Sequence, residues 1–120
     1  MPATPADRRP IALVGRELIT VTRITEALAA AGYEVRRVDD PADLPAADGI
    51  GAVLVDWSER QPGWGEALQT WRHAATVPPR VLLFGPHADV AAHTAARDSG
   101  LGPMMARSKL FASLPTLLGR

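Results

Sequence analysis

Short apolar runs alternate along the chain with segments in which apolar residues recur at helical spacing. Residues 11–15, 52–56 and 81–84 are apolar almost throughout, which is typical of strands that are buried on both faces. Residues 33–39 alternate between apolar and polar positions, as a half-buried strand does, and residues 103–106 form a weaker run. The pattern therefore predicts five strands.

The segments between these runs predict helices, because their apolar residues fall three or four positions apart. Four such segments are present, at residues 16–32, 64–75, 88–100 and 108–118. The connection at residues 40–51 is rich in Pro and Asp and has room for only one or two helical turns. A helix between the second and third strands is therefore expected to be shortened.

Strands that alternate with helices predict an α/β fold with a parallel sheet and helices on both of its faces. Residues 10–120 are expected to form one domain, and residues 1–9 a loose N-terminal tail. Ligand sites in such sheets lie beyond the carboxyl ends of the strands. Functional residues are therefore sought at the strand ends.

Composition narrows the possible functions. The formal net charge is zero and Lys109 is the only lysine, so neither nucleic acid nor a membrane surface is expected as a partner. There is no cysteine, which excludes disulfides and thiolate metal sites. No apolar run approaches the roughly 20 residues that span a bilayer. We expect a cytoplasmic protein without a cofactor.

Four sequence stretches together resemble a bacterial response-regulator receiver domain. They are VGRELITVTRITEALAAAGYEV, AVLVDWS, VLLFGPH and DSGLGPMMARS, and the resemblance covers Pro10 to Leu118. It implies a flavodoxin-like (βα)5 three-layer sandwich with the strand order 2-1-3-4-5. It also implies that Asp56, which ends the third apolar run, stands at the phosphoacceptor position.

The chain departs from the receiver family at the other positions that carry its chemistry. In that family an acidic pair after the first strand holds Mg²⁺, a Thr or Ser ends the fourth strand, and a Lys ends the fifth. Here Gly15 and Arg16 replace the acidic pair and Gly85 replaces the Thr or Ser. Arg107 stands at the Lys position, unless a register shifted by two uses Lys109, which falls inside the last predicted helix. The chain is therefore expected to be a degenerate receiver.

Phosphoryl transfer to a carboxylate requires cancellation of negative charge. Glu17 alone is a poor substitute for an acidic pair, and Arg16 places a positive charge where Mg²⁺ would bind. Metal-assisted phosphorylation of Asp56 is therefore not expected. Either Arg16 or Arg107 pairs with Asp56 through its guanidinium, or Asp56 caps backbone amides in the turn that follows it.

Two further groups of residues are candidates for a role. Trp57 directly follows Asp56 in a predicted loop, and we expect it to be exposed and to line a pocket or an interface. His87, Asp89 and His93 could bind a metal, but solvent-exposed positions in a loop and helix are favoured for them.

We expect a stand-alone signalling or protein-interaction module that is not an enzyme. The resemblance implies a surface for a protein partner or a homodimer, formed by residues 88–100, 103–106 and 108–118. Its expected contact residues are Ala92, Ala96, Met105 and Phe111, although Met105 is equally compatible with the core. The alternatives are a single-domain response regulator phosphorylated at Asp56, and a small-anion sensor or enzyme at the strand ends.

Overall fold

The computed structural model describes residues 9–118, apart from the side chain of residue 115. The predicted N-terminal tail lies outside the described residues except for its last position. No helix in the described part of the chain is long and apolar enough to cross a membrane.

The centre of the fold is a five-stranded parallel sheet with the order β2-β1-β3-β4-β5. Its strands are β1 (Ile11–Val14), β2 (Val35–Val38), β3 (Ala52–Asp56), β4 (Arg80–Gly85) and β5 (Met104–Ala106). In the register, Asp56 lies opposite Phe84, and Gly85 lies opposite Ala106. The predicted fold class and strand order are confirmed, and the carboxyl ends of the strands meet at one edge.

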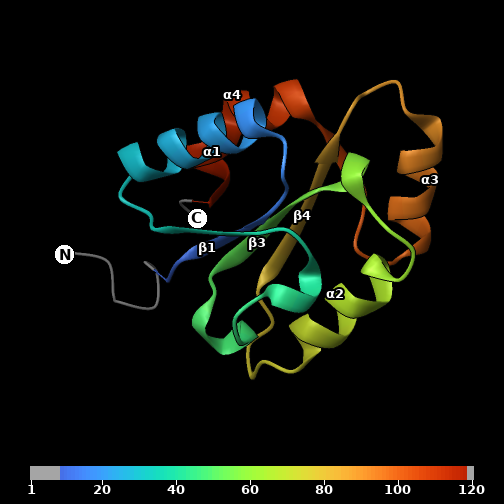
Figure 1. Ribbon diagram of the computed structural model, residues 1–120, viewed down its shortest axis with the longest axis horizontal. Helices are drawn as coiled ribbons and strands as arrows, with labels where there is room; N and C mark the ends of the chain where they lie inside the picture. Colours follow the sequence, from blue (N-terminus) through green and yellow to red (C-terminus); the bar gives the residue numbers. More distant parts are fainter. Residues whose placement is uncertain (1–8, 119–120) are drawn as a thin grey trace.

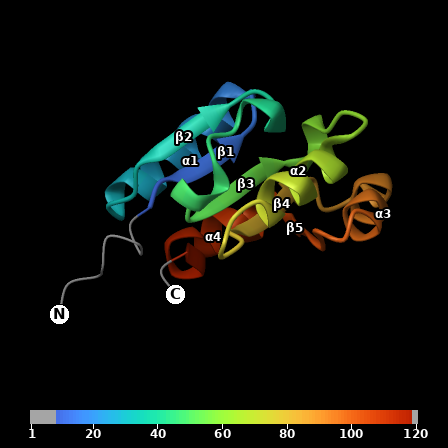
Figure 2. The same cartoon turned by 90° about the horizontal axis from the view of Figure 1, so that it is seen from below.

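Two layers of helices cover the sheet (Figures 1 and 2). They are α1 (Leu18–Ala30), α2 (Trp64–His73), α3 (Val90–Asp98) and α4 (Arg107–Leu118). Helices α1 and α4 pack on one face, whereas α2 and α3 pack on the other. Each helix follows the carboxyl end of a strand in the chain and therefore starts near that edge of the sheet.

The two central strands are buried on both faces, as their unbroken apolar sequences predict. Ala12, Val14, Val53 and Val55 face α2 and α3, and the residues that alternate with them face α1 and α4. Because successive side chains of a strand point to opposite faces, one short strand contributes to both halves of the core.

The predicted shortening of the second helix is confirmed. Two 3₁₀ turns, η2 (Pro41–Asp43) and η3 (Ala47–Gly49), replace it. Two tryptophans of α2 bind this connection: the indole N–H of Trp64 donates to Asp40 Oδ2 at 3.3 Å, and that of Trp71 donates to the Pro45 carbonyl at 2.7 Å. A third 3₁₀ turn, η4 (Trp57–Glu59), directly follows β3.

Candidate functional site

Asp56 lies at the carboxyl edge of the sheet and is almost completely buried, with 2% of its surface exposed. It is the last residue of β3, and its neighbour across the edge is the backbone of Gly15, which follows β1. A Cβ atom added to Gly15 would lie 3.3 Å from the Asp56 Cβ. Positions 15 and 56 are therefore adjacent in the structure, as the resemblance implies.

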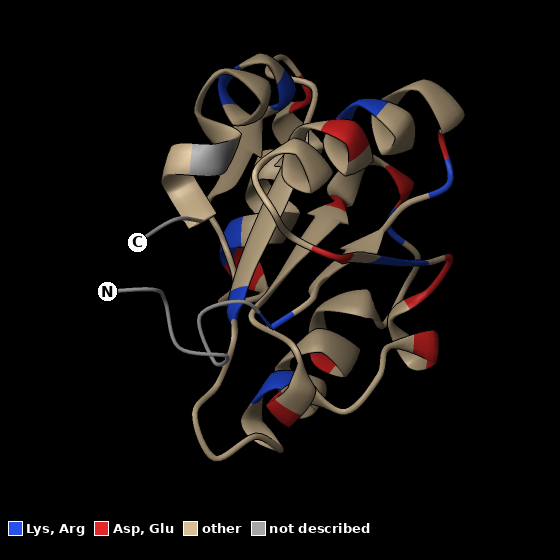
Figure 3. Ribbon diagram, turned by 90° about the vertical axis from the view of Figure 1, so that its left-hand side faces the viewer, with Lys and Arg blue, Asp and Glu red and all other residues tan. Residues whose placement is uncertain are grey.

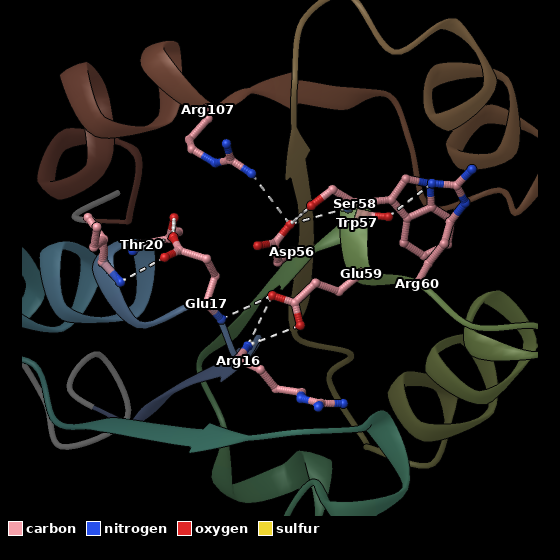
Figure 4. Close-up of polar contacts among 10 residues, drawn as sticks. Arg16, Glu17, Thr20, Asp56, Trp57, Ser58, Glu59, Arg60 and Arg107 are labelled. Atoms are coloured by element: carbon pink, nitrogen blue, oxygen red, sulfur yellow. Dashed lines mark hydrogen bonds and ion pairs between the residues drawn. The ribbon is translucent and has the colours of Figure 1, made fainter.

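The carboxylate of Asp56 caps the turn that follows it. Its Oδ1 atom accepts hydrogen bonds from the Ser58 amide at 3.2 Å and from the Ser58 hydroxyl at 2.5 Å (Figure 4). Asp56 is therefore the N-cap of η4. Of the two interpretations left open by the sequence, capping therefore supplies the close contacts of this carboxylate.

Arg107 adds an ion pair but no hydrogen bond. Its Nη2 atom lies 3.8 Å from Asp56 Oδ1, and its side chain is 36% exposed. No described residue accepts a hydrogen bond from its buried Nε. Lys109 is exposed within α4. Arg107, and not Lys109, therefore faces the carboxylate, although without the expected two-bond grip.

Arg16 does not pair with Asp56. Its side chain extends away from that carboxylate, whereas its backbone amide faces Glu59 (Figure 4). Both oxygens of Glu59 accept from the Arg16 amide at 3.1 Å, and Oε2 also accepts from the Glu17 amide at 3.1 Å. Sequence reasoning missed Glu59. Its only signal was an acid three residues after Asp56, beside the predicted site.

Glu17 is engaged with its own helix. Its carboxylate accepts from the amides of Ile19 at 3.0 Å and Thr20 at 2.9 Å and from the Thr20 hydroxyl, so Glu17 is the N-cap of α1. The hydroxyl hydrogen bond from Thr20 is the main cause that holds the pKa of Glu17 below its ordinary value. This carboxylate therefore serves α1 and not Asp56.

Burial raises the pKa of Asp56 above its ordinary value. The hydroxyl of Ser58 opposes this rise, the negative charge of Glu59 adds to it, and Arg107 opposes it. Because burial outweighs the stabilising contacts, the negative charge on Asp56 is only partly compensated by its surroundings.

A hydroxyl-bearing residue at position 85 would require the side chain of Met104 to move. A Cβ atom added to Gly85 would lie 2.8 Å from the sulfur of Met104, which is 4% exposed. Real Cβ atoms essentially never approach another heavy atom that closely. Met104 therefore occupies the space of the Thr or Ser that the resemblance implies.

The residues at this edge do not fit the Mg²⁺ that the resemblance implies. Mg²⁺ requires several oxygen ligands in near-octahedral geometry. Positions 15 and 16 supply no carboxylate, Glu17 caps α1, and Glu59 binds backbone amides. The described residues contain no group of three or more potential metal ligands, at this edge or elsewhere.

The prediction that Trp57 is exposed is wrong. The side chain is 2% exposed and belongs to the core between the sheet and α3. Its indole N–H donates to the Ala92 carbonyl at 3.1 Å. The 3₁₀ turn directs the ring into the core, where burial of a large aromatic surface is favourable once its N–H finds a partner.

Two of the four predicted interface residues are also corrected. Ala92 and Ala96 are completely buried, because the small residues of α3 allow that helix to lie close to the sheet. Met105 and Phe111 are half-buried and pack against the other half of the core. The guanidinium of Arg23 lies 3.9 Å from the centre of the Phe111 ring. Only these two residues of the four can contribute side chains to a surface.

The histidines near the start of α3 have structural partners. Asp89 caps α3 by accepting from the Ala92 amide at 3.0 Å. A ring nitrogen of His93 lies 2.9 Å from the His87 carbonyl, and the two rings meet edge to face. These contacts favour the structural interpretation over a metal site.

The structure contains a groove lined in part by Trp57, which agrees with the expectation that this residue lines a pocket. It lies between α2 and α3, has a volume of about 670 Å³, and is lined by residues that include Trp57, Arg60, Gly63 and Ala95.

Figure 3 shows basic and acidic residues interspersed over the ribbon on the side that it draws, which agrees with a net charge of zero.

Solved structures support the fold. The chain is similar to a response regulator receiver domain protein from Clostridium thermocellum, with 16% identity over 91% of this chain and 90% of that chain and a TM-score of 0.68. It is also similar to the receiver domain of the TMAO respiratory system response regulator TorR, with 18% identity, coverages of 92% and 96%, and a TM-score of 0.70.

These likenesses establish a receiver-type fold, whereas identities this low leave the chemistry to be argued from the site. No protein-family model matches the chain. No curated protein sequence matches it either.

Proposed function

We propose that this chain is a signalling module that acts by binding a protein, either a partner or a second copy of itself, without a phosphorylation switch at Asp56. It is not an enzyme. The observation that carries the proposal is the occupation of the Asp56 site by the protein's own groups. Ser58 binds the carboxylate, Met104 fills the space beside Gly85, and Glu59 occupies the amides after β1.

The charge balance at the site supports this proposal. Phosphoryl transfer brings an anionic donor to an anionic acceptor, and catalysis consists mainly of positioning and charge cancellation. Arg107 is the cation nearest to Asp56 among the ion pairs of the described residues, at 3.8 Å. One partly exposed guanidinium replaces neither a metal ion nor the hydroxyl at position 85, so a donor phosphate would be weakly stabilised.

The proposed binding surface is the α3/β5/α4 face. Strand β5 is an outer strand of the sheet, so one side of it has no neighbouring strand in the described part of the chain. Val90, at the start of α3, is 74% exposed, and Met105 of β5 is half-buried. Large apolar side chains that face solvent are typical of binding surfaces when they lie together.

A phosphodonor experiment tests the absence of a switch. The protein is incubated with Mg²⁺ and either a small acyl phosphate or beryllofluoride, and is followed by intact mass and by amide NMR spectra. We expect neither a gain in mass nor shifts around Asp56. A change that disappears in Asp56→Asn would instead establish a phosphorylated single-domain regulator.

A separate thermal unfolding experiment tests the small-anion alternative. Thermal unfolding is measured with inorganic phosphate at constant ionic strength, in the wild type and in Arg107→Ala. Stabilisation that is lost in the variant would favour an anion sensor or an enzyme at the strand ends over the interaction module.

The binding surface is tested by charge insertion. Val90→Asp places a charge on the α3/β5/α4 face, and Val77→Asp is the matched control, because Val77 is 66% exposed outside that face, between α2 and β4. We expect self-association in sedimentation equilibrium, or capture of a partner from cell extract, to be lost in Val90→Asp alone. Equal behaviour of both variants would exclude this face.

A further inference from the structure

Glu59 joins two segments that are more than 40 residues apart in the sequence. It ends η4, yet both of its carboxylate oxygens accept from the Arg16 amide and one also accepts from the Glu17 amide, each at 3.1 Å. The contact links the loop after β1 to the turn after β3, across the edge where Asp56 ends its strand (Figure 4).

The position of these amides explains why a carboxylate binds there. Amides at the start of a helix have no partner within the helix, and the helix dipole favours negative charge at that end. Glu17 satisfies the amides of Ile19 and Thr20 within α1. Glu59 satisfies the amides of Arg16 and Glu17, which lie just before the first residue of α1, from a different part of the chain.

We infer that Glu59 is a permanent clamp that fixes the loop after β1 to the turn after β3. This inference deepens the proposed function, on which it rests for the statement that the edge has no switch. The mismatch with Mg²⁺ supports this inference. A metal ion would need carboxylate ligands in the loop after β1, but that loop has Gly15 and Arg16, and the Arg16 amide binds the carboxylate of Glu59. The carboxylate belongs to the same chain as the amides that it binds. These hydrogen bonds therefore hold the two segments together without a metal ion or a phosphoryl group.

The reach of the side chain is part of the inference. Two amides are contacted by two oxygens in three hydrogen bonds, a geometry that depends on the length of a glutamate. Glu59→Ala removes the carboxylate, whereas Glu59→Asp keeps the charge and shortens the side chain by one methylene. Both variants should open the clamp. Because Glu59→Asp keeps the negative charge, opening in that variant would show that the direct hydrogen bonds, and not the charge alone, hold the two segments together.

Amide hydrogen exchange followed by NMR tests the clamp. We expect exchange at Arg16 and Glu17 to become about tenfold faster or more in Glu59→Ala and Glu59→Asp, because local opening then exposes both amides. Amides of the core, such as that of Leu54, should exchange at the wild-type rate. Glu26→Ala is the matched control, because Glu26 is an exposed glutamate of α1.

Two results would overturn the inference. The first is a change of less than about twofold at both amides in Glu59→Ala, which would mean that the carboxylate does not protect them. The second is an equal acceleration of core amides, which would mean that Glu59 acts on global stability. The phosphodonor experiment remains separate: phosphorylation of a wild type whose two amides are protected by Glu59 would refute the proposed function and leave the clamp in place.

Discussion

Gly85 allows a quantitative test of how the site is filled. A side chain at this position would begin with a Cβ atom 2.8 Å from the Met104 sulfur and 3.5 Å from its methyl carbon. Favourable contacts between such atoms occur at about 3.5–4.0 Å, so Gly85→Ala creates an overlap of roughly 1 Å with the sulfur. Overpacking of a core on this scale costs about 1–3 kcal/mol.

The cost should depend on Met104. Met104→Ala alone removes a buried side chain and should cost about 2–5 kcal/mol. In the double variant the new methyl group enters space that the sulfur has left. The double variant should therefore be more stable than the sum of the single effects predicts, by at least about 1 kcal/mol. Gly85→Ser should cost no less than Gly85→Ala, because the clash occurs at Cβ.

Urea unfolding monitored by tryptophan fluorescence measures all of these variants. Gly49→Ala is the matched control: no atom lies within 4 Å of its added Cβ, and its free energy of unfolding should change by no more than about 0.5 kcal/mol. A stabilised Gly85→Ala, or a coupling with Met104 below about 0.3 kcal/mol, would refute the conclusion that the sulfur fills this space.

Three further predictions concern the surroundings of Asp56. Glu17→Ala should lower the free energy of unfolding in urea, because α1 loses its N-cap, and Glu17→Asp should recover most of the loss. Trp57→Phe should cost about 1–3 kcal/mol in the same assay, because the Ala92 carbonyl loses a buried donor and a cavity forms; a cost below about 0.5 kcal/mol would contradict the buried position. The third prediction concerns pH. The pKa of Asp56 in the folded state lies above its ordinary value of 3.8, so the folded state binds more protons than the unfolded state at pH values between the two pKa values. The free energy of unfolding should therefore fall as the pH rises from the unfolded-state pKa through the folded-state pKa. Asp56→Asn should lack this component of the pH dependence when unfolding is measured across the acidic range. Identical pH profiles of stability in the wild type and in Asp56→Asn would contradict the prediction.

The sheet and the position of Asp56 could be predicted because both depend on local patterns. Apolar runs define the strands, and an acid at the end of one run necessarily reaches the carboxyl edge of a parallel sheet. The short connection before β3 was predictable from its proline and aspartate content, since proline interrupts helices and aspartate favours turns. The order of the strands, in contrast, came from the resemblance and not from the pattern.

The errors arose where a side chain's direction depends on tertiary packing. The polar residues that follow Trp57 indicated an exposed loop, but the turn that they form directs the ring inward. Ala92 and Ala96 fit a shallow surface and a closely packed helix equally well, so composition alone could not decide between them. Glu59 contacts amides 43 and 42 residues away, and its position three residues after Asp56 does not indicate which groups it contacts.

The differences from the receiver pattern are coupled in space, and this coupling bears on what single substitutions can restore. An acid at position 15 would bring its Cβ to within 3.3 Å of the Asp56 Cβ, tighter than nine in ten real contacts. A hydroxyl at position 85 requires Met104 to move. An acid at position 16 would place its charge beside the carboxylate of Glu59, which binds the amide of that same residue. Each reversion therefore meets a neighbouring group that already fills the space or already carries a negative charge. If Asp56 is not phosphorylated, as we propose, a single reversion should not make it a phosphoacceptor, and the ligands and the space-filling groups would have to be changed together.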